Sequence, residues 1–292
     1  MTDRVPDFED RRWGEFPEAL VRGLNYQATT AINHFTVSFV LGKNQMGSGT
    51  LVDAYGERGI LTAFHVVEEF DRHLDLPIFM IISRKVYRFN LPRECFEHVP
   101  LGTPKDEKRP ELGPDLSFLK LAPATHQVST LEAIKSFYRI RDNPLDVHDG
   151  LSIADIPFEK LSWWLAGAPA ERGKRRIMED SGKQLLQAAH MVGRAEYKGL
   201  ESDNGFDRLT IKIPESVDLY PGDYGGCSGG GIWTTGMFKD KPSEPDESIE
   251  VFPLLMGIAY VQFEARDGYI EIVANGPKSL ASLKKIPGGP GR

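Results

Sequence analysis

The sequence predicts an all-β fold with a few short helices. Short segments rich in β-branched and aromatic residues recur along the 292-residue chain, and glycine, proline or charged residues separate them. Helical patterns stand out in only two places, Glu18–Leu24 and Thr130–Arg141. A chain of this length buries a substantial core, and β-barrel units of this size often count as one structural domain.

The first half of the chain is predicted to form one barrel, with bounds of about 29–122. Residues 1–28 before it form an N-terminal extension that contains the first helical piece. A connector at about 123–158 follows the barrel and contains the second helical stretch. The predicted strands of this half are 34–40, 49–52, 59–62, 78–82, 85–89 and 116–121.

The second half is predicted to form another barrel at about 159–275. Its first strand, Leu161–Pro169, ends in a Gly-x-Pro turn. The remaining predicted strands are His190–Ala195, Arg208–Ile213, Phe252–Val261 and Tyr269–Ala274. Residues 276–292, which end in a run of proline and glycine, are expected to be a flexible tail.

One glycine-rich loop carries the strongest chemical signal. Ser228 lies within Gly226-Cys227-Ser228-Gly229-Gly230, directly before strand-forming residues. A serine hydroxyl is a poor nucleophile until a histidine removes its proton and a third group orients that histidine. His65 follows an apolar run and Asp115 begins an alternating apolar strand, so both partners are available.

The order of these residues along the chain separates two folds that share the chemistry. The loop also satisfies the G-x-S-x-G pattern of α/β-hydrolases, in which the histidine follows the serine. Here every histidine precedes Ser228, so that pattern is excluded. The order His65, Asp115, Ser228 is instead the one found in double β-barrel proteases. The seven histidines are at positions 34, 65, 73, 98, 126, 148 and 190.

Three motifs together resemble those of the trypsin-like, chymotrypsin-fold serine peptidases, in particular bacterial members related to the high-temperature-requirement proteases. They are Gly47–Val52 with Thr62–Val66, then Asp115–Leu119, then Gly226–Gly230. The resemblance spans roughly residues 30 to 275. It implies two six-stranded antiparallel β-barrels of the trypsin-like type and serine endopeptidase activity.

The catalytic roles follow from this order. Ser228 is expected to attack the scissile carbonyl, with His65 as general base and then general acid, and with Asp115 orienting the imidazole. The backbone N–H groups of Gly226 and Ser228 are the expected oxyanion donors. Glycine at 226 suits a turn that demands positive φ.

Substrate selection is predicted from the same resemblance. The residue six before the serine, at the base of the pocket in this family, is Gly222, and Asp223 follows it. Asp223 either favours a basic substrate residue or is an ordinary turn residue. The stretch after Ala259, namely Tyr260, Val261 and Gln262, is expected to pair with the substrate backbone as a strand.

The two cysteines, Cys95 and Cys227, are expected to be free thiols. Cys227 stands where digestive trypsins have the aspartate of the zymogen switch, so that switch should be absent. It is predicted to be a small buried structural residue. A cysteine nucleophile is the competing interpretation, but Ser228 occupies the place next to the paired glycines.

Composition and local patterns exclude several classes of protein. Acidic residues outnumber basic ones by 42 to 35, for a formal charge of −7, which argues against a protein dominated by nucleic-acid contacts. The sequence predicts no signal peptide and no membrane span, so a cytoplasmic location is expected. Metal-ligand spacing and a phosphate-binding lysine are missing, so neither a metal nor another cofactor is expected.

The predicted function is therefore hydrolysis of peptide bonds in protein or peptide substrates, through an acyl-enzyme. Without a zymogen switch, we expect narrow specificity or control by a regulatory protein partner. The alternative is a catalytically inactive pseudoprotease that binds a peptide or protein. Esterase activity toward small acyl substrates is a third, less favoured interpretation.

Overall fold

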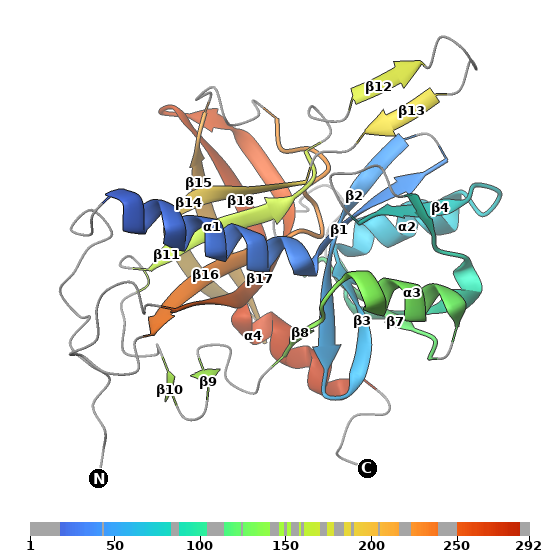
Figure 1. Ribbon diagram of the computed structural model, residues 1–292, viewed down its shortest axis with the longest axis horizontal. Helices are drawn as coiled ribbons and strands as arrows, with labels where there is room; N and C mark the ends of the chain where they lie inside the picture. Colours follow the sequence, from blue (N-terminus) through green and yellow to red (C-terminus); the bar gives the residue numbers. More distant parts are fainter. Residues whose placement is uncertain are drawn as a thin grey trace.

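The computed structural model describes most of the chain. The described residues are 18–42, 44–82, 88–103, 114–123, 125–140, 146–148, 151–152, 158, 161–169, 174–177, 184–187, 190–203, 205–215, 223–238 and 250–286. The fold is mostly β, with a closed barrel beside a second sheet and a few helices (Figure 1).

The C-terminal half forms a closed six-stranded antiparallel barrel, in the order β11-β14-β15-β18-β17-β16. This confirms one of the two predicted six-stranded barrels. Alternate residues of β15 are buried inside it, which matches the two-residue period of a strand. The strands are β11 (Ser162–Gly167), β14 (Met191–Asp203), β15 (Phe206–Pro214), β16 (Gly231–Phe238), β17 (Glu250–Arg266) and β18 (Tyr269–Asn275).

The N-terminal half forms an eight-stranded sheet rather than the predicted six-stranded barrel. Its main path is β5-β4-β1-β2-β3-β7-β6, and β8 pairs with β2 in parallel. Among the described residues no pairing joins the outer strands β5 and β6, so closure is not confirmed. The strands are β1 (Thr36–Leu41), β2 (Asn44–Ala54), β3 (Glu57–Thr62), β4 (Ile78–Ile81), β5 (Arg88–Asn90), β6 (Phe96–Gly102), β7 (Leu116–Leu121) and β8 (Tyr138–Arg139).

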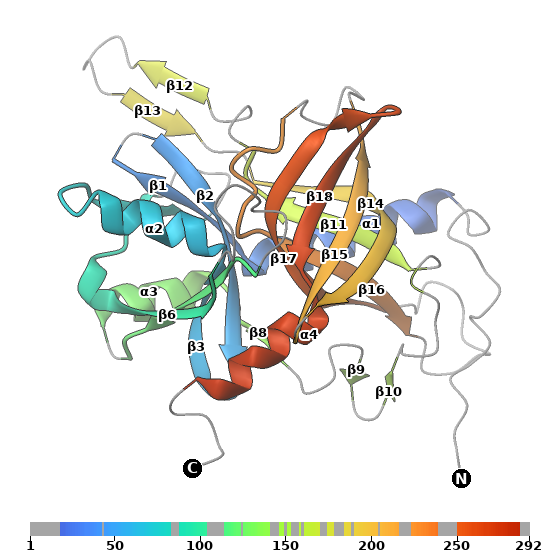
Figure 2. The same cartoon turned by 180° about the vertical axis from the view of Figure 1, so that it is seen from behind.

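Two small hairpins lie outside these sheets. One consists of β9 (Asp146–His148) and β10 (Leu151–Ser152). The other consists of β12 (Lys174–Ile177) and β13 (Gln184–Gln187), in the segment between β11 and β14. This second hairpin projects away from both sheets (Figures 1 and 2).

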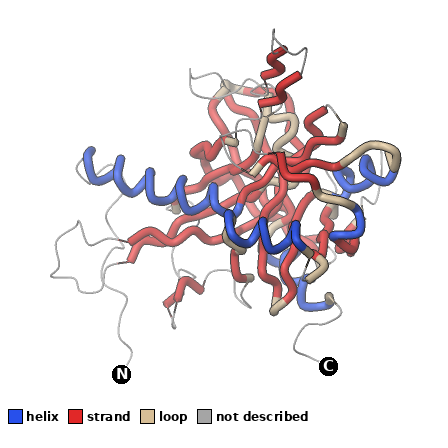
Figure 3. Tube along the Cα trace, turned by 45° about the vertical axis from the view of Figure 1, so that its right-hand side comes forward, coloured by secondary structure: helices blue, strands red, loops and turns tan. Residues whose placement is uncertain are grey.

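The N-terminal helix is much longer than the sequence predicted. α1 runs from Glu18 to Phe35 and crosses the outside of the barrel toward the N-terminal sheet (Figure 3). Its Ala28 and Ile32 are fully buried in a cluster with Trp233 of β16. The Phe35 ring stacks on Trp233 with a centroid separation of 5.5 Å. The helix that begins in the predicted N-terminal extension therefore helps to join the two halves.

Residues 276–286, after the barrel, also fold, although the sequence predicted a flexible tail at 276–292; the rest of that tail, 287–292, lies outside the described residues. Helix α4 (Pro277–Leu280) is followed by a 3-10 helix, η7 (Ala281–Lys285), between the barrel and the sheet (Figure 2). The Asp207 carboxylate accepts the N–H groups of Lys278 and Ser279 at 2.9 and 2.7 Å. Leu280, Leu283 and Ile286 are buried in the same cluster as Trp233.

Helices α2 and α3 cover the N-terminal sheet. α2 (Phe64–Arg72) begins directly after β3 and buries Val66, Val67 and Phe70. α3 (His126–Ile134) begins earlier than the predicted stretch Thr130–Arg141. It starts there because the Thr125 side chain accepts the N–H of Val128 and caps the helix.

Lys135, directly after α3, is a buried cation at the end of another helix. Its Nζ donates to the carbonyl oxygens of Asn33 and Thr36, each at 2.8 Å, where α1 ends. A cation is favourable at a helix C-terminus, but burial opposes the charge. Burial lowers the pKa of Lys135 from 10.5 to about 8.

This shift predicts that stability rises with pH across an alkaline window. Between pH 8 and 10.5 the unfolded chain keeps the Lys135 proton that the folded protein has lost, so the free energy of unfolding increases there. We expect a gain of about 1–3 kcal/mol over this window. Urea unfolding at several pH values would measure it. Lys135→Met should lack this contribution, so its free energy of unfolding should rise by about 1–3 kcal/mol less over the same pH window. Equal pH slopes in the two proteins would contradict the lowered pKa of Lys135.

Candidate active site

His65 and Asp115 form a hydrogen-bonded pair on the N-terminal sheet. His65 lies in the first turn of α2, and Asp115 directly precedes β7. The pairing of Thr62 with Ser117 between β3 and β7 brings the two segments together. His65 Nδ1 lies 2.6 Å from Asp115 Oδ2, and the His65 backbone N–H donates to Asp115 Oδ1 at 3.1 Å.

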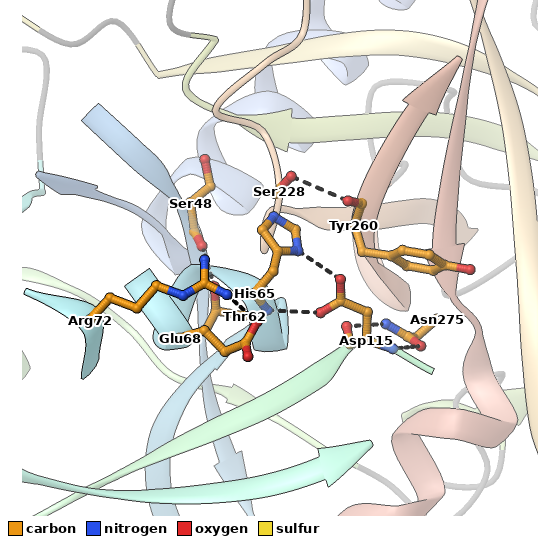
Figure 4. A network of polar contacts seen from close by, with 9 residues as sticks. All are labelled: Ser48, Thr62, His65, Glu68, Arg72, Asp115, Ser228, Tyr260 and Asn275. Carbon is orange, nitrogen blue, oxygen red and sulfur yellow. Dashed lines mark hydrogen bonds and ion pairs between the residues drawn. The ribbon is translucent and has the colours of Figure 1, made fainter. Parts of the chain in front are cut away.

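The buried Asp115 carboxylate fixes the orientation of His65 through two contacts. The Asp115 side chain is 1% exposed, whereas that of His65 is 40% exposed. Both carboxylate oxygens bind the same residue, one through its ring and one through its backbone. This contact favours the tautomer with the proton on Nδ1, which leaves Nε2 as a proton acceptor. Figure 4 shows the ring between Asp115 and Ser228, with Nε2 turned toward the serine.

Ser228 reaches the same place from the barrel half, on the loop before β16. Its Oγ donates to the carbonyl oxygen of Tyr260 at 3.4 Å, rather than to His65. The structure thus brings the three predicted residues together but leaves the serine hydroxyl directed elsewhere. Hydrogen bonds of catalytic groups are often long or poorly aligned before substrate binds.

The loop around Ser228 leaves two particular N–H groups without an acceptor. Within the described residues, the backbone N–H groups of Gly226 and Ser228 have no hydrogen-bond partner, whereas those of their loop neighbours do. Gly226 has φ +90°, which glycine adopts readily. These are the two donors that the sequence predicted for an oxyanion. The neighbours with acceptors are Tyr224, Gly225, Cys227, Gly229 and Gly230.

A serine from the N-terminal sheet holds this loop. The Ser48 backbone N–H donates to Ser228 O at 2.7 Å, and Ser48 Oγ donates to Gly226 O at 2.7 Å. Ser48 Oγ also accepts the N–H of Ala168 at 2.9 Å. Ser48 is fully buried. The sequence places Ser48 in a motif but indicates no role for it, because its contacts lie in the other half of the molecule and leave no local pattern.

The residues predicted to bind substrate differ in where the structure places them and in what they contact. Gly222 lies outside the described residues. Asp223 Oδ1 accepts the N–H of Gly225 at 2.7 Å and the amide of Gln262 at 2.9 Å, which favours its interpretation as a turn residue. Gln262 Oε1 accepts the N–H of Tyr224 at 2.8 Å, so both ends of this amide hold the loop.

Tyr260 and Val261 belong mainly to the core. The Tyr260 side chain is buried and Val261 packs against the same cluster in the N-terminal half. What they present at the site is backbone, as the carbonyl of Tyr260 does to Ser228. Contacts of these two positions with a bound peptide would therefore be made by the main chain, which gives affinity rather than sequence specificity.

Both cysteines are free thiols, as predicted, and both are buried, which was predicted for Cys227 alone. Cys227 lies in the barrel core against Gly167, where an added Cβ would be 3.0 Å from its Sγ. The thiol therefore points inward, away from the side on which a substrate must approach. This location favours the structural interpretation of Cys227.

Two other histidines contact serines, but burial excludes both pairs as nucleophile sites. His98 Nε2 lies 3.0 Å from Ser117 Oγ, and His190 Nε2 lies 3.0 Å from Ser38 Oγ. Ser117 and Ser38 are both fully buried. Burial lowers the pKa of His98, while Asp71 acts in the opposite direction. These pairs are structural contacts.

The described residues contain no group of three or more His, Cys, Asp or Glu side chains that could hold a metal ion. Within the same segments, none of the helices combines the length and apolar character that crossing a membrane requires.

Comparison with known proteins gives only distant likenesses. No family model matches the sequence, and no curated protein matches it. Among solved structures, Deg5 is similar at 14% identity and a TM-score of 0.44, over 94% of this chain and 99% of that chain. A structure from work on the coupled folding and binding of the intrinsically disordered Sesbania mosaic virus VPg protein is similar at 12% identity and a TM-score of 0.41, over 82% of this chain and 85% of that chain.

Proposed function

We propose that this protein is a trypsin-like serine endopeptidase that hydrolyses peptide bonds through an acyl-enzyme. One observation carries the proposal. The loop around Ser228 leaves the N–H groups of Gly226 and Ser228 without a hydrogen-bond partner among the described residues, and it lies beside the hydrogen-bonded pair of His65 and the buried Asp115. Two N–H donors at this position would stabilise the negative charge that develops on the carbonyl oxygen of a substrate.

The mechanism assigns one task to each group. Asp115 holds the His65 ring with its proton on Nδ1, and Nε2 takes the Ser228 proton as Oγ attacks the carbonyl carbon. The oxyanion that forms accepts hydrogen bonds from the N–H groups of Gly226 and Ser228; loss of one such donor typically costs about 10²–10³ in rate. His65 then protonates the leaving amine. A water molecule repeats the sequence on the acyl-enzyme and restores Ser228.

Protein or peptide chains are the proposed substrates. The pairing of β17 with β16 ends at Ile258, and β17 itself continues to Arg266. We propose that an extended substrate lies along the part of β17 that follows Ala259, next to the nucleophile loop, and pairs through its backbone. Narrow specificity or a regulatory protein partner would restrain such an enzyme in place of a zymogen switch.

A pseudoprotease is the second candidate, and one contact favours it. Ser228 Oγ donates to Tyr260 O rather than to His65. If that arrangement persisted with a peptide bound, the serine would not be deprotonated, and the site would bind peptides without cleaving them.

A fluorophosphonate probe distinguishes the two candidates. We expect a single adduct on Ser228, located by mass spectrometry, because phosphonylation requires the same deprotonated serine and oxyanion donors as acyl transfer. Ser228→Ala and His65→Ala should not react, while Ser129→Ala, at an exposed serine of α3, should react normally. A folded wild-type protein that takes up no probe would support the pseudoprotease instead.

A further inference from the structure

Asp115 is held in place by a residue from the other half of the molecule. The side chain of Asn275, at the end of β18 in the barrel, is buried against it. Asn275 Nδ2 donates to the Asp115 carbonyl oxygen at 2.7 Å, and the Asp115 N–H donates to Asn275 Oδ1 at 3.2 Å (Figure 4). One amide therefore satisfies both backbone groups of the aspartate.

This contact has the form of one rung of a β-ladder. In an antiparallel pair, a residue exchanges its N–H and C=O with a single residue opposite. A side-chain amide carries a donor and an acceptor side by side, so Asn275 can take the place of that residue. A serine hydroxyl donates and accepts through a single atom and leucine offers neither group, whereas asparagine presents its donor and its acceptor on two separate atoms.

Fixing both backbone groups of Asp115 also fixes the direction of its side chain, because the Cα–Cβ bond starts between them. The carboxylate then meets His65 with both oxygens, at 2.6 and 3.1 Å. Without Asn275, the Asp115 N–H and C=O would be buried and unpaired, and the segment would have to shift to reach other partners.

We infer that Asn275 is a positioning residue that aims the Asp115 carboxylate at His65 from across the boundary between the sheet and the barrel. This inference deepens the proposed function and rests on it for its catalytic consequence. The aiming itself is a structural property that can be measured whether or not the protein is an enzyme.

The experiment compares Asn275→Leu and Asn275→Asp with the wild type. Leucine has a similar volume without polar groups, and aspartate keeps an acceptor but loses the donor. Thr234→Val is the matched control, because Thr234 is a buried barrel residue whose Oγ1 bonds to Ser162 O, at 3.0 Å, and not to the site. Proton NMR would follow the low-field resonance of the His65 Nδ1 proton, and fluorophosphonate labelling would follow Ser228.

Both Asn275 variants should lose or shift the His65 resonance and label about 10²-fold more slowly. Thr234→Val should keep the resonance even if its melting temperature falls as far as those of the Asn275 variants. An unchanged resonance in both Asn275 variants, or none in the wild type, would overturn the inference. If the wild type shows the resonance but never labels, the proposed function fails, while loss of the resonance in the variants still supports the role of Asn275.

Discussion

Changing Asp115 to asparagine is expected to lower peptide-bond hydrolysis about 10⁴-fold while the protein stays folded. Asparagine has nearly the same shape, so it fits the buried site. Its amide nitrogen, however, must face one of two donors, the backbone N–H or the ring Nδ1–H of His65. The ring escapes this clash by moving its proton to Nε2, and an Nε2–H cannot accept the proton of Ser228.

The measurement is kcat/KM on a cleaved peptide, together with the rate of Ser228 phosphonylation and the melting temperature. Asp53→Asn is the control, because Asp53 accepts a turn N–H from Gly56 at 2.9 Å, which asparagine can also accept, and its ion pair with the half-exposed Arg58, at 3.8 Å, lies on the surface. Full activity in Asp115→Asn would show that the observed pair is not part of catalysis.

Changing Gly229 to alanine should damage both stability and the site, although it alters no reacting group. Gly229 has φ +87°, and an added Cβ would lie 2.0 Å from Ser48 O and 2.1 Å from Thr62 Oγ1. Ser48 O belongs to the backbone of β2 and cannot rotate away. We expect a loss of about 4 kcal/mol or more in the free energy of unfolding, and labelling of Ser228 slowed about 10²-fold or more.

Gly268→Ala separates the effect of positive φ on stability from the effect of the close contact with Ser48. Gly268 also has positive φ, at +79°, but no atom lies within 4 Å of an added Cβ. It should cost only the backbone strain, about 1–2 kcal/mol, and leave labelling unchanged. Equal losses in the two variants, measured by chemical denaturation, would mean that the contact with Ser48 is unimportant.

The sequence predicts best the strands that are rich in apolar residues and buried in the core. β7 was predicted with its observed bounds, because alternating apolar residues place it in the core. β6 was missed because Phe96–Gly102 includes Glu97, His98 and Pro100, and most of its residues are only half-buried. A strand at the edge of a sheet needs no apolar pattern, so local sequence carries little signal for it.

The ends of the chain were mispredicted for a different reason. α1 continues through Thr29 and Thr30, which have low helix propensity, because Ala28 and Ile32 pack against Trp233. The proline and glycine near the C-terminus predict flexibility, but the apolar residues just before them are buried in the same cluster. In both places, tertiary contacts outweigh local preference.

The candidate site also has residues that local sequence predicts and one that it does not. The order of His65, Asp115 and Ser228 could be taken from motifs because the chemistry requires those residue types. Asn275 could not, because a single asparagine at the end of a strand has no pattern, and its partner is 160 positions away in the sequence. Residues that reach across from one half to the other become visible only when the halves are placed together.

The segment that follows the last strand has a consequence for synthesis of the protein on the ribosome. Leu283 and Ile286 share a core cluster with Ile32 of α1 and with Trp233. Ile32 leaves the ribosome long before Leu283 and Ile286, so this core cannot be complete until those two residues have emerged. Asn275 also emerges late. The contact between Asn275 and Asp115 therefore forms only after residue 275 has left the ribosome, so the proposed catalytic centre is assembled after both halves of the molecule have been made.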